Sequence, residues 1–283
     1  HLARREVKCE YRRLFFFKSV SADTTVESTS MNGISRPRAH LLYSFSRSAV
    51  LYKQFMGSTS SHSMSPPVKV QPKEKATASL IFLHGLGDTG HGWAEQFKEC
   101  SFKHIRCIFP HAPQKPVTLN AGMVMPSWFD IKGLTPNSPE DEHGIKEACK
   151  ELQHLIAKEV NDGIAPERIV VGGFSQGGSV ALYTTFATNT KVGGVVALST
   201  WIPMNKHFTN QSNNKYNTEV PVLQCHGLAD PLVPHRWGQA THEIIKSFNS
   251  KAQFKSYSGM GHSSCAEEME DVRVFLVNLL TDS

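Results

Sequence analysis

The sequence predicts an α/β fold with one mostly parallel, doubly wound sheet, and three features support this prediction. Short apolar runs alternate with longer runs of helical periodicity from about residue 78 to the end of the 283-residue chain. The apolar runs are rich in β-branched residues and nearly free of charge, as strands covered on both faces require. Glycine-rich or polar segments follow them, where open α/β sheets gather their functional groups. Because the pattern contains neither an internal repeat nor a second apolar core, we expect one domain.

The first half of this domain begins with two short strands. A strand is expected at 79–83, a helix at 93–100, and a second strand at 105–109, which Pro110 ends. Residues 110–139 contain six prolines, and we expect an irregular stretch there. So long a loop inside a compact domain usually has a function.

The second half continues the alternation of helices and strands. An amphipathic helix is predicted from about Asp141 to Asn161, because its apolar residues repeat at helical spacing. A polar loop is expected over 205–219. The other predicted elements are strand 168–173, helix 176–188, strand 192–198, strand 220–225, helix 235–248, strand 253–257 and helix 265–280.

The basic charge of the chain is concentrated near its N-terminus. We expect residues 1–76 to be an extension and linker, and residues 77–283 to form the domain. Residues 1–55 hold ten Lys and Arg against four Asp and Glu, whereas residues 56–283 hold 20 against 21. The net charge of +5 therefore belongs to the extension, which argues against a nucleic-acid partner for the domain.

Residues 1–55 are rich in Arg and Ser and leave two interpretations. They fit an organelle-targeting transit peptide, and they also fit a leader that is disordered or absent from the mature protein. In the second case Met56 is the true start, and Gly57 begins a sequence that matches an N-myristoylation signal.

The spacing of the cysteines and histidines favours neither disulfide bonds nor a metal site. The six cysteines form no C-x-x-C pair, and several lie in apolar runs, so we expect buried reduced thiols and a cytoplasmic compartment. The 14 histidines show no metal-ligand spacing, and we predict no metal. Because no apolar run approaches 18 residues, we expect at most peripheral membrane contact.

The segment Gly173-Phe-Ser-Gln-Gly177 matches the G-x-S-x-G pattern of a nucleophile elbow. In such a turn a serine sits between a strand and a helix, and only glycine leaves room for its crowded neighbours. The alternative is a glycine-rich turn that binds a phosphate or nothing, because the pattern alone is common.

Three predicted strand ends hold Ser175, Asp230 and His262, in the chain order of an α/β-hydrolase triad. A serine hydroxyl needs an imidazole to take its proton and a carboxylate to orient that imidazole. Alone, the aspartate fits a helix cap and the histidine a solvated loop residue. Their order and their positions at strand ends favour a catalytic triad within a single-domain α/β-hydrolase.

An oxyanion hole needs two hydrogen-bond donors. The first is expected to be the backbone amide of Gln176, directly after the predicted nucleophile, and the second the amide of Leu86 in the loop His84-Gly-Leu-Gly87. This loop does not fit dinucleotide binding, because it contains no G-x-G-x-x-G that opens a helix. We therefore predict no cofactor.

Five blocks together resemble the acyl-protein thioesterase and lysophospholipase-type carboxylesterase family. The blocks are His84–Trp93, Pro126–Ile131, Gly173–Gly178, His226–Pro234 and Gly261–His262. The resemblance implies a cytosolic serine hydrolase whose substrates are S-acylated proteins, lysophospholipids or small acyl esters. It implies the triad and oxyanion residues given above, and an acyl channel near Leu86, Trp128, Trp201, Leu232 and Val233. For these apolar residues, ordinary core packing is the alternative.

Two other functions remain open from the sequence. The first is a general short-chain carboxylesterase without a protein substrate. The second is a non-catalytic α/β-hydrolase that binds a small ligand, although such proteins usually lack a member of the triad, and here Ser175, Asp230 and His262 are all present.

Overall fold

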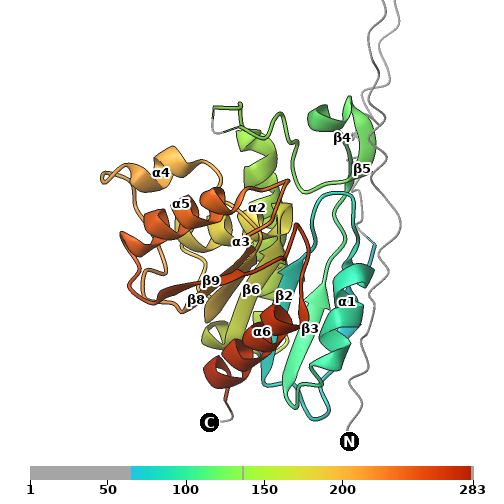
Figure 1. Ribbon diagram of the computed structural model, residues 1–283. Coiled ribbons are helices and arrows are strands. Elements are labelled where there is room, and N and C mark those ends of the chain that lie inside the picture. Colours follow the sequence, from blue (N-terminus) through green and yellow to red (C-terminus); the bar gives the residue numbers. More distant parts are fainter. Residues whose placement is uncertain (1–64, 136, 282–283) are drawn as a thin grey trace, which may run out of the picture. The chain divides into compact units, whose positions relative to one another are not determined.

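The computed structural model describes residues 65–135 and 137–281 (Figure 1). Within these residues, seven strands form one sheet in the order β1-β3-β2-β6-β7-β8-β9, and all neighbours except β1 and β3 are parallel. The predicted doubly wound α/β sheet is therefore confirmed. The strands are β1 Val68–Val70, β2 Ala78–Leu83, β3 Ile105–Phe109, β6 Ile169–Phe174, β7 Gly194–Leu198, β8 Val222–Gly227 and β9 Ala252–Tyr257.

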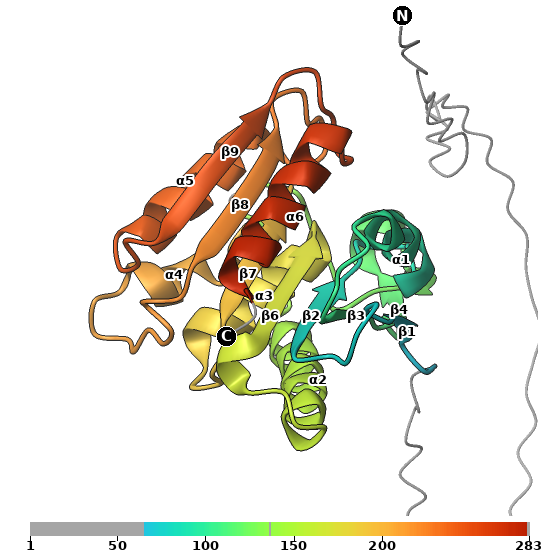
Figure 2. The same cartoon turned by 90° about the horizontal axis from the view of Figure 1, so that it is seen from below.

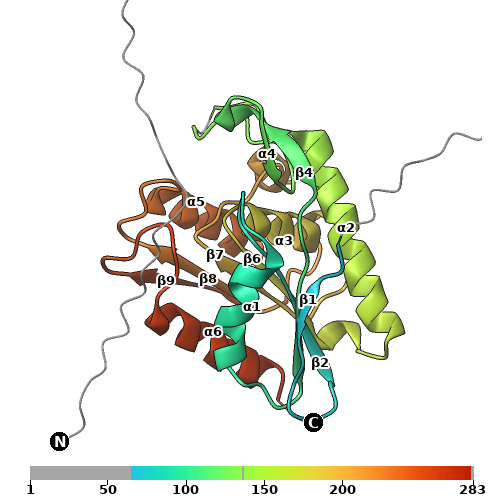
Figure 3. The same ribbon diagram turned by 90° about the vertical axis from the view of Figure 1, so that its right-hand side faces the viewer.

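Helices cover both faces of this sheet. One apolar cluster joins the strands to α1 and α6, and a second cluster joins them to α2, α3 and α5. Figures 2 and 3 show these helices on opposite sides of the sheet. The helices are α1 Gly90–Glu99, α2 Glu142–Asn161, α3 Gln176–Ala187, α4 Asn205–Thr209, α5 His235–Lys246 and α6 Ala266–Leu279.

Strand β2 shows why the sheet needs helices on both sides. All six of its residues are buried. Leu80 and Phe82 belong to the cluster with α1 and α6, whereas Ile81 and Leu83 belong to the cluster with α2, α3 and α5. Successive side chains of a strand point to opposite faces, so an uninterrupted apolar run is compatible with a strand only between two helical layers.

Four short elements lie where the sequence predicted linker or loop. Strand β1 falls inside the expected linker, so residues 68–70 belong to the sheet. Strands β4 Gln114–Val117 and β5 Met123–Pro126 form an antiparallel hairpin inside the expected irregular stretch, and α4 lies inside the expected polar loop. Those expectations were wrong at these segments. Each element is only three to five residues long, and β4 and β5 each contain a proline, which disfavours strand prediction.

Several predictions for the N-terminus fall outside the described residues. These are the transit peptide or leader over residues 1–55, the start at Met56 and the modification of Gly57. In the part of the chain that is described, no helix combines the length and the apolar composition needed to cross a bilayer.

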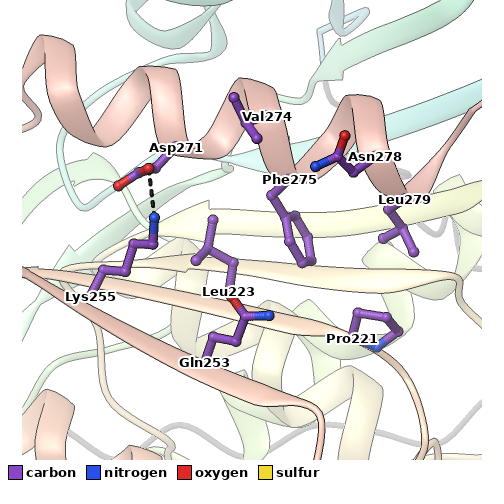
Figure 4. A pocket seen from close by; sticks show the side chains of 9 residues that line it. All are labelled: Pro221, Leu223, Gln253, Lys255, Asp271, Val274, Phe275, Asn278 and Leu279. Carbon is purple, nitrogen blue, oxygen red and sulfur yellow. Dashed lines mark hydrogen bonds and ion pairs between the residues drawn. The ribbon is translucent and has the colours of Figure 1, made fainter.

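One pocket lies between α6 and the edge of the sheet (Figure 4). Its volume is about 310 Å³, and Lys255 forms an ion pair with Asp271 at one end of it. The pocket lies near the amino ends of β8 and β9, because Pro221 and Gln253 are among the residues that line it. None of the residues that line it is a predicted site residue, so the pocket is separate from the predicted triad.

Helix α6 buries the carboxyl group of Glu268. Its side chain is fully buried, and neither carboxyl oxygen has a hydrogen-bond partner among the described residues. Burial raises the pKa of Glu268 to about 8, and the nearby Asp271 carboxylate adds to the shift. Between the ordinary pKa of a glutamate and pH 8, the unfolded chain therefore binds fewer protons than the folded protein at this group.

We expect Glu268 to lower the free energy of unfolding by about 3 kcal/mol as pH rises from 5 to 8. Replacing Glu268 by Gln should flatten this dependence, because an amide does not ionise. The measurement is urea unfolding at several pH values. Glu267→Gln is the matched control, because Glu267 is exposed on the same turn and its loss should leave the slope unchanged. Equal slopes for Glu268→Gln and the parent protein would contradict the prediction.

Candidate active site

Ser175 occupies the sharp turn between β6 and α3. Its backbone has φ 53° and ψ −119°, a conformation that residues with a side chain rarely adopt. A Cβ at Gly173 would lie 2.4 Å from the carbonyl carbon of Gly177, and a Cβ at Gly177 would lie 2.2 Å from the Leu83 carbonyl oxygen. Both glycines are therefore required by close backbone approach, as the elbow pattern predicts.

The structure brings Ser175, His262 and Asp230 into one hydrogen-bonded relay. His262 Nε2 lies 2.9 Å from Ser175 Oγ, and His262 Nδ1 lies 2.7 Å from Asp230 Oδ2. Because a carboxylate only accepts, Nδ1 carries the proton and Nε2 is free to accept the serine proton. The Asp230 side chain is fully buried, whereas the His262 side chain is 13% exposed. The hydroxyl and imidazole thus lie toward the surface with the carboxylate behind them.

Asp230 is held as a carboxylate by several donors. Its Oδ1 accepts hydrogen bonds from the amides of Leu232 and Val233, both at 2.9 Å. Its Oδ2 also lies 3.4 Å from Nε2 of His226, a buried histidine at the end of β8. Burial opposes the charge, but hydrogen bonds from His226 and His262 outweigh it and hold the pKa of Asp230 well below its usual range. The group facing His262 is therefore anionic.

The Gln176 side chain connects the start of α3 to the segment after β5. Its Nε2 donates to Ser127 Oγ at 3.0 Å and to the Phe129 carbonyl at 2.6 Å, and its Oε1 accepts from the Trp128 amide at 3.0 Å. The Gln176 amide is the first N–H of the helix, and such groups have no acceptor within their own helix. The predicted oxyanion donor is thus the first backbone amide of α3. It belongs to a residue whose side chain is held by three hydrogen bonds.

The loop after β2 packs directly on the elbow. A Cβ at Gly85 would lie 3.5 Å from Ser175 Cβ, which places the neighbouring Leu86 close to the serine. The buried His84 supports this loop, because its Nδ1 donates to the Gly85 carbonyl at 2.7 Å and its Nε2 accepts from the Ala112 amide at 3.0 Å. Burial lowers the pKa of His84, which keeps the ring neutral as these two bonds require.

The sequence patterns described above do not identify His84, His226 or the side chain of Gln176 as supports of the site. One signal could have found both histidines: each directly precedes a glycine at the carboxyl end of a buried strand. Gln176 has no such signal, because the hydrogen-bond partners of its side chain lie 47 to 49 residues before it in the chain.

The five predicted acyl contacts separate into two groups. Trp128 is only 2% exposed, and its Nε1 donates to the His84 carbonyl at 2.9 Å, so its side chain packs in the core. Val233 is equally buried. Leu86 and Trp201 are partly exposed, and Leu232 is 38% exposed. For Trp128 and Val233, core packing therefore describes the side chain better than direct contact with a ligand.

Within residues 65–135 and 137–281, no group of three or more His, Cys, Asp or Glu side chains is arranged to hold a metal ion. The polar groups next to Ser175 are instead the imidazole of His262 and the backbone amide at the start of α3. Such an arrangement can move the serine proton to an imidazole and stabilise negative charge at the elbow.

Comparison with known proteins agrees with this arrangement. The family model described as phospholipase/carboxylesterase matches residues 65–280. Acyl-protein thioesterase 1 of Cryptococcus neoformans var. neoformans is 43% identical over 231 residues, which cover 75% of this chain and 97% of that protein. Acyl-protein thioesterase 1 of Gibberella zeae is 41% identical over 220 residues, covering 74% of this chain and 94% of that protein.

Among solved structures, Zea mays acyl-protein thioesterase 2 superposes with a TM-score of 0.67 at 31% identity. The match covers 76% of this chain and 98% of the maize protein. Fold, site geometry and sequence similarity lead to one assignment. The chain belongs to the phospholipase/carboxylesterase family and is a hydrolase with the α/β-hydrolase fold.

Proposed function

We propose that the protein cleaves fatty-acyl thioesters and esters through a covalent acyl-enzyme on Ser175. The observation that carries this proposal is the relay from Ser175 Oγ to His262 Nε2 and from His262 Nδ1 to Asp230, with distances of 2.9 and 2.7 Å. A nucleophile, a base with a free acceptor nitrogen and an ionised carboxylate are the three groups that this chemistry needs.

In the first half-reaction, His262 Nε2 takes the proton of Ser175 as Oγ attacks the acyl carbonyl carbon. The amides of Gln176 and Leu86 donate to the oxygen that becomes negative, aided by the N-terminus of α3. His262 then gives its proton to the departing thiolate or alkoxide. The carbonyl is restored, and the acyl group remains bound to Ser175.

In the second half-reaction, a water molecule gives a proton to His262 Nε2 and attacks the acyl-enzyme. Collapse of the second tetrahedral intermediate returns the proton to Ser175 Oγ and releases a fatty acid. Throughout both steps Asp230 holds Nδ1 protonated and stabilises the imidazolium, which forms twice in each turnover.

For the substrate we propose S-acylated proteins, with lysophospholipids and small acyl esters as further substrates. The sequence similarity to acyl-protein thioesterases over most of the domain supports this class. Exposed or partly exposed apolar side chains near the site, including Leu86, Leu228 and Leu232, provide surface for an acyl chain. We place the reaction in the cytoplasm, because Cys107, Cys149 and Cys225 are buried free thiols, which suit a reducing compartment.

The test uses the wild-type protein and four reagents. We expect a fluorophosphonate probe to label Ser175, as identified by peptide mass spectrometry. We also expect kcat/KM for an S-palmitoyl peptide to equal or exceed that for p-nitrophenyl butyrate, with measurable release of palmitate from lysophosphatidylcholine. Absence of labelling would favour a ligand-binding protein instead. Labelling with turnover of the short ester alone would identify a short-chain carboxylesterase.

A further inference from the structure

The peptide group that joins Ser175 to Gln176 faces two environments. Its C=O and N–H belong to one planar trans unit and therefore point in opposite directions. If the N–H meets the substrate oxygen, as proposed above, the Ser175 carbonyl must point away from the substrate into the protein. Any contact that holds this carbonyl also sets the direction of the Gln176 N–H.

Three donors converge on the Ser175 carbonyl oxygen. Thr200 Oγ1 lies 2.6 Å from it, the Ser179 amide 3.1 Å and Ser179 Oγ 3.4 Å. The alternative acceptor for the Thr200 hydroxyl, the Trp201 carbonyl, is farther away at 3.4 Å. The two hydroxyl oxygens lie 3.1 Å apart, so the single proton of the Ser179 hydroxyl has a second acceptor in Thr200 Oγ1, which is nearer to it than the Ser175 carbonyl. The result is a chain of hydrogen bonds that ends on the elbow peptide.

Packing holds the Thr200 side chain in this position. Thr200 is 1% exposed and lies two residues beyond the end of β7. A Cβ at Gly178 would lie only 2.8 Å from Thr200 Cβ and Cγ2, so the side chain fits tightly against α3. The Ser175 amide donates to the Leu198 carbonyl at 2.9 Å, which anchors the other side of the same residue to β7.

We propose that Thr200 is a positioning residue that holds the Ser175–Gln176 peptide in the orientation needed to bind the oxyanion. This inference rests on the proposed function. The backbone of Ser175 is strained at φ 53°, so the surrounding contacts must maintain its conformation. A hydrogen bond to a carbonyl oxygen also polarises the peptide and makes its N–H a stronger donor. Thr200 therefore acts on the reaction through a peptide group that it contacts from the side opposite the substrate.

The test compares variants at Thr200 with a control variant at Thr185, another buried threonine. Thr200→Val removes the hydroxyl and keeps the shape, and we expect it to lower kcat for p-nitrophenyl butyrate about tenfold with KM within twofold of wild type. Thr200→Ser keeps the hydroxyl and should retain most of the activity. The control is Thr185→Val, because Thr185 is buried in α3 and donates to the Ala181 carbonyl at 2.8 Å, away from the elbow. Its kcat should stay within twofold of wild type.

Active sites are counted by titration with a fluorophosphonate, so that kcat refers to folded enzyme alone. If Thr200→Val does not fold, Thr200→Cys, which offers a weak donor of similar size, should show an intermediate kcat. The inference is overturned if Thr200→Val matches Thr185→Val, or if Thr200→Ser is as impaired as Thr200→Val. In either case wild type would still be labelled and active, and the proposed function would stand. An unlabelled, inactive wild type would overturn both.

Discussion

Replacing Ser175 by alanine is expected to lower kcat for ester hydrolysis on the order of 10⁶-fold while the protein stays folded. The change removes only the hydroxyl that lies 2.9 Å from His262 Nε2. Alanine has the same Cβ as serine, so it adopts φ 53° at the same backbone cost and adds no clash. Hydrolysis of p-nitrophenyl butyrate and thermal unfolding are the two measurements.

Ser175→Gly provides the matched control for this experiment. It also removes the hydroxyl and should be equally inactive, but glycine adopts a positive φ without strain, and we expect it to stabilise the fold by about 1 kcal/mol relative to alanine. Substantial hydrolysis by either variant would show that another residue is the nucleophile.

Replacing Asp230 by asparagine is expected to lower kcat/KM on the order of 10⁴-fold. The reason is the pattern of donors around the carboxylate. Oδ1 accepts from the amides of Leu232 and Val233, so the asparagine oxygen must take that position. Its NH₂ group then faces His262 Nδ1 and forces Nδ1 to accept. The imidazole proton moves to Nε2, where it blocks transfer from Ser175.

The rate of fluorophosphonate labelling should fall together with kcat/KM in Asp230→Asn, because both reactions need the free Nε2. Asp162→Asn serves as the control, since Asp162 is exposed at the end of α2 and its replacement should change neither rate. An Asp230→Asn variant within tenfold of wild type would show that the carboxylate does not set the tautomer of His262.

The main sheet could be predicted from sequence because burial on both faces leaves a strong local pattern. The residues of β2 and β6 form continuous apolar runs, and their ends are marked by His84-Gly85 and by the glycines around Ser175. The parallel arrangement then places the carboxyl ends of β6 and β8 at the same edge. For this reason the sequence alone points to Ser175, Asp230 and His262.

The supporting contacts could not be predicted, because they join residues far apart in the chain without periodic signals. Gln176 reaches Phe129 across 47 residues, and Thr200 reaches Ser175 across 25. The family resemblance and the residue type place Trp128 in the acyl channel, and neither distinguishes a buried ring from one that lines a channel. The β4–β5 hairpin contains prolines and exposed apolar residues, which break the alternation expected of a strand.

The hydrogen bonds of the Gln176 side chain also bear on which parts of the surface can change without affecting the site. They fix the base of the segment after β5. The turn between β4 and β5, in contrast, has open space around Gly122, and Met123 and Val124 at the start of β5 are more than half exposed. Mutations in that turn change the outer surface and leave the Gln176 peptide in place. Changes to this outer surface are therefore separable from the chemistry proposed at Ser175.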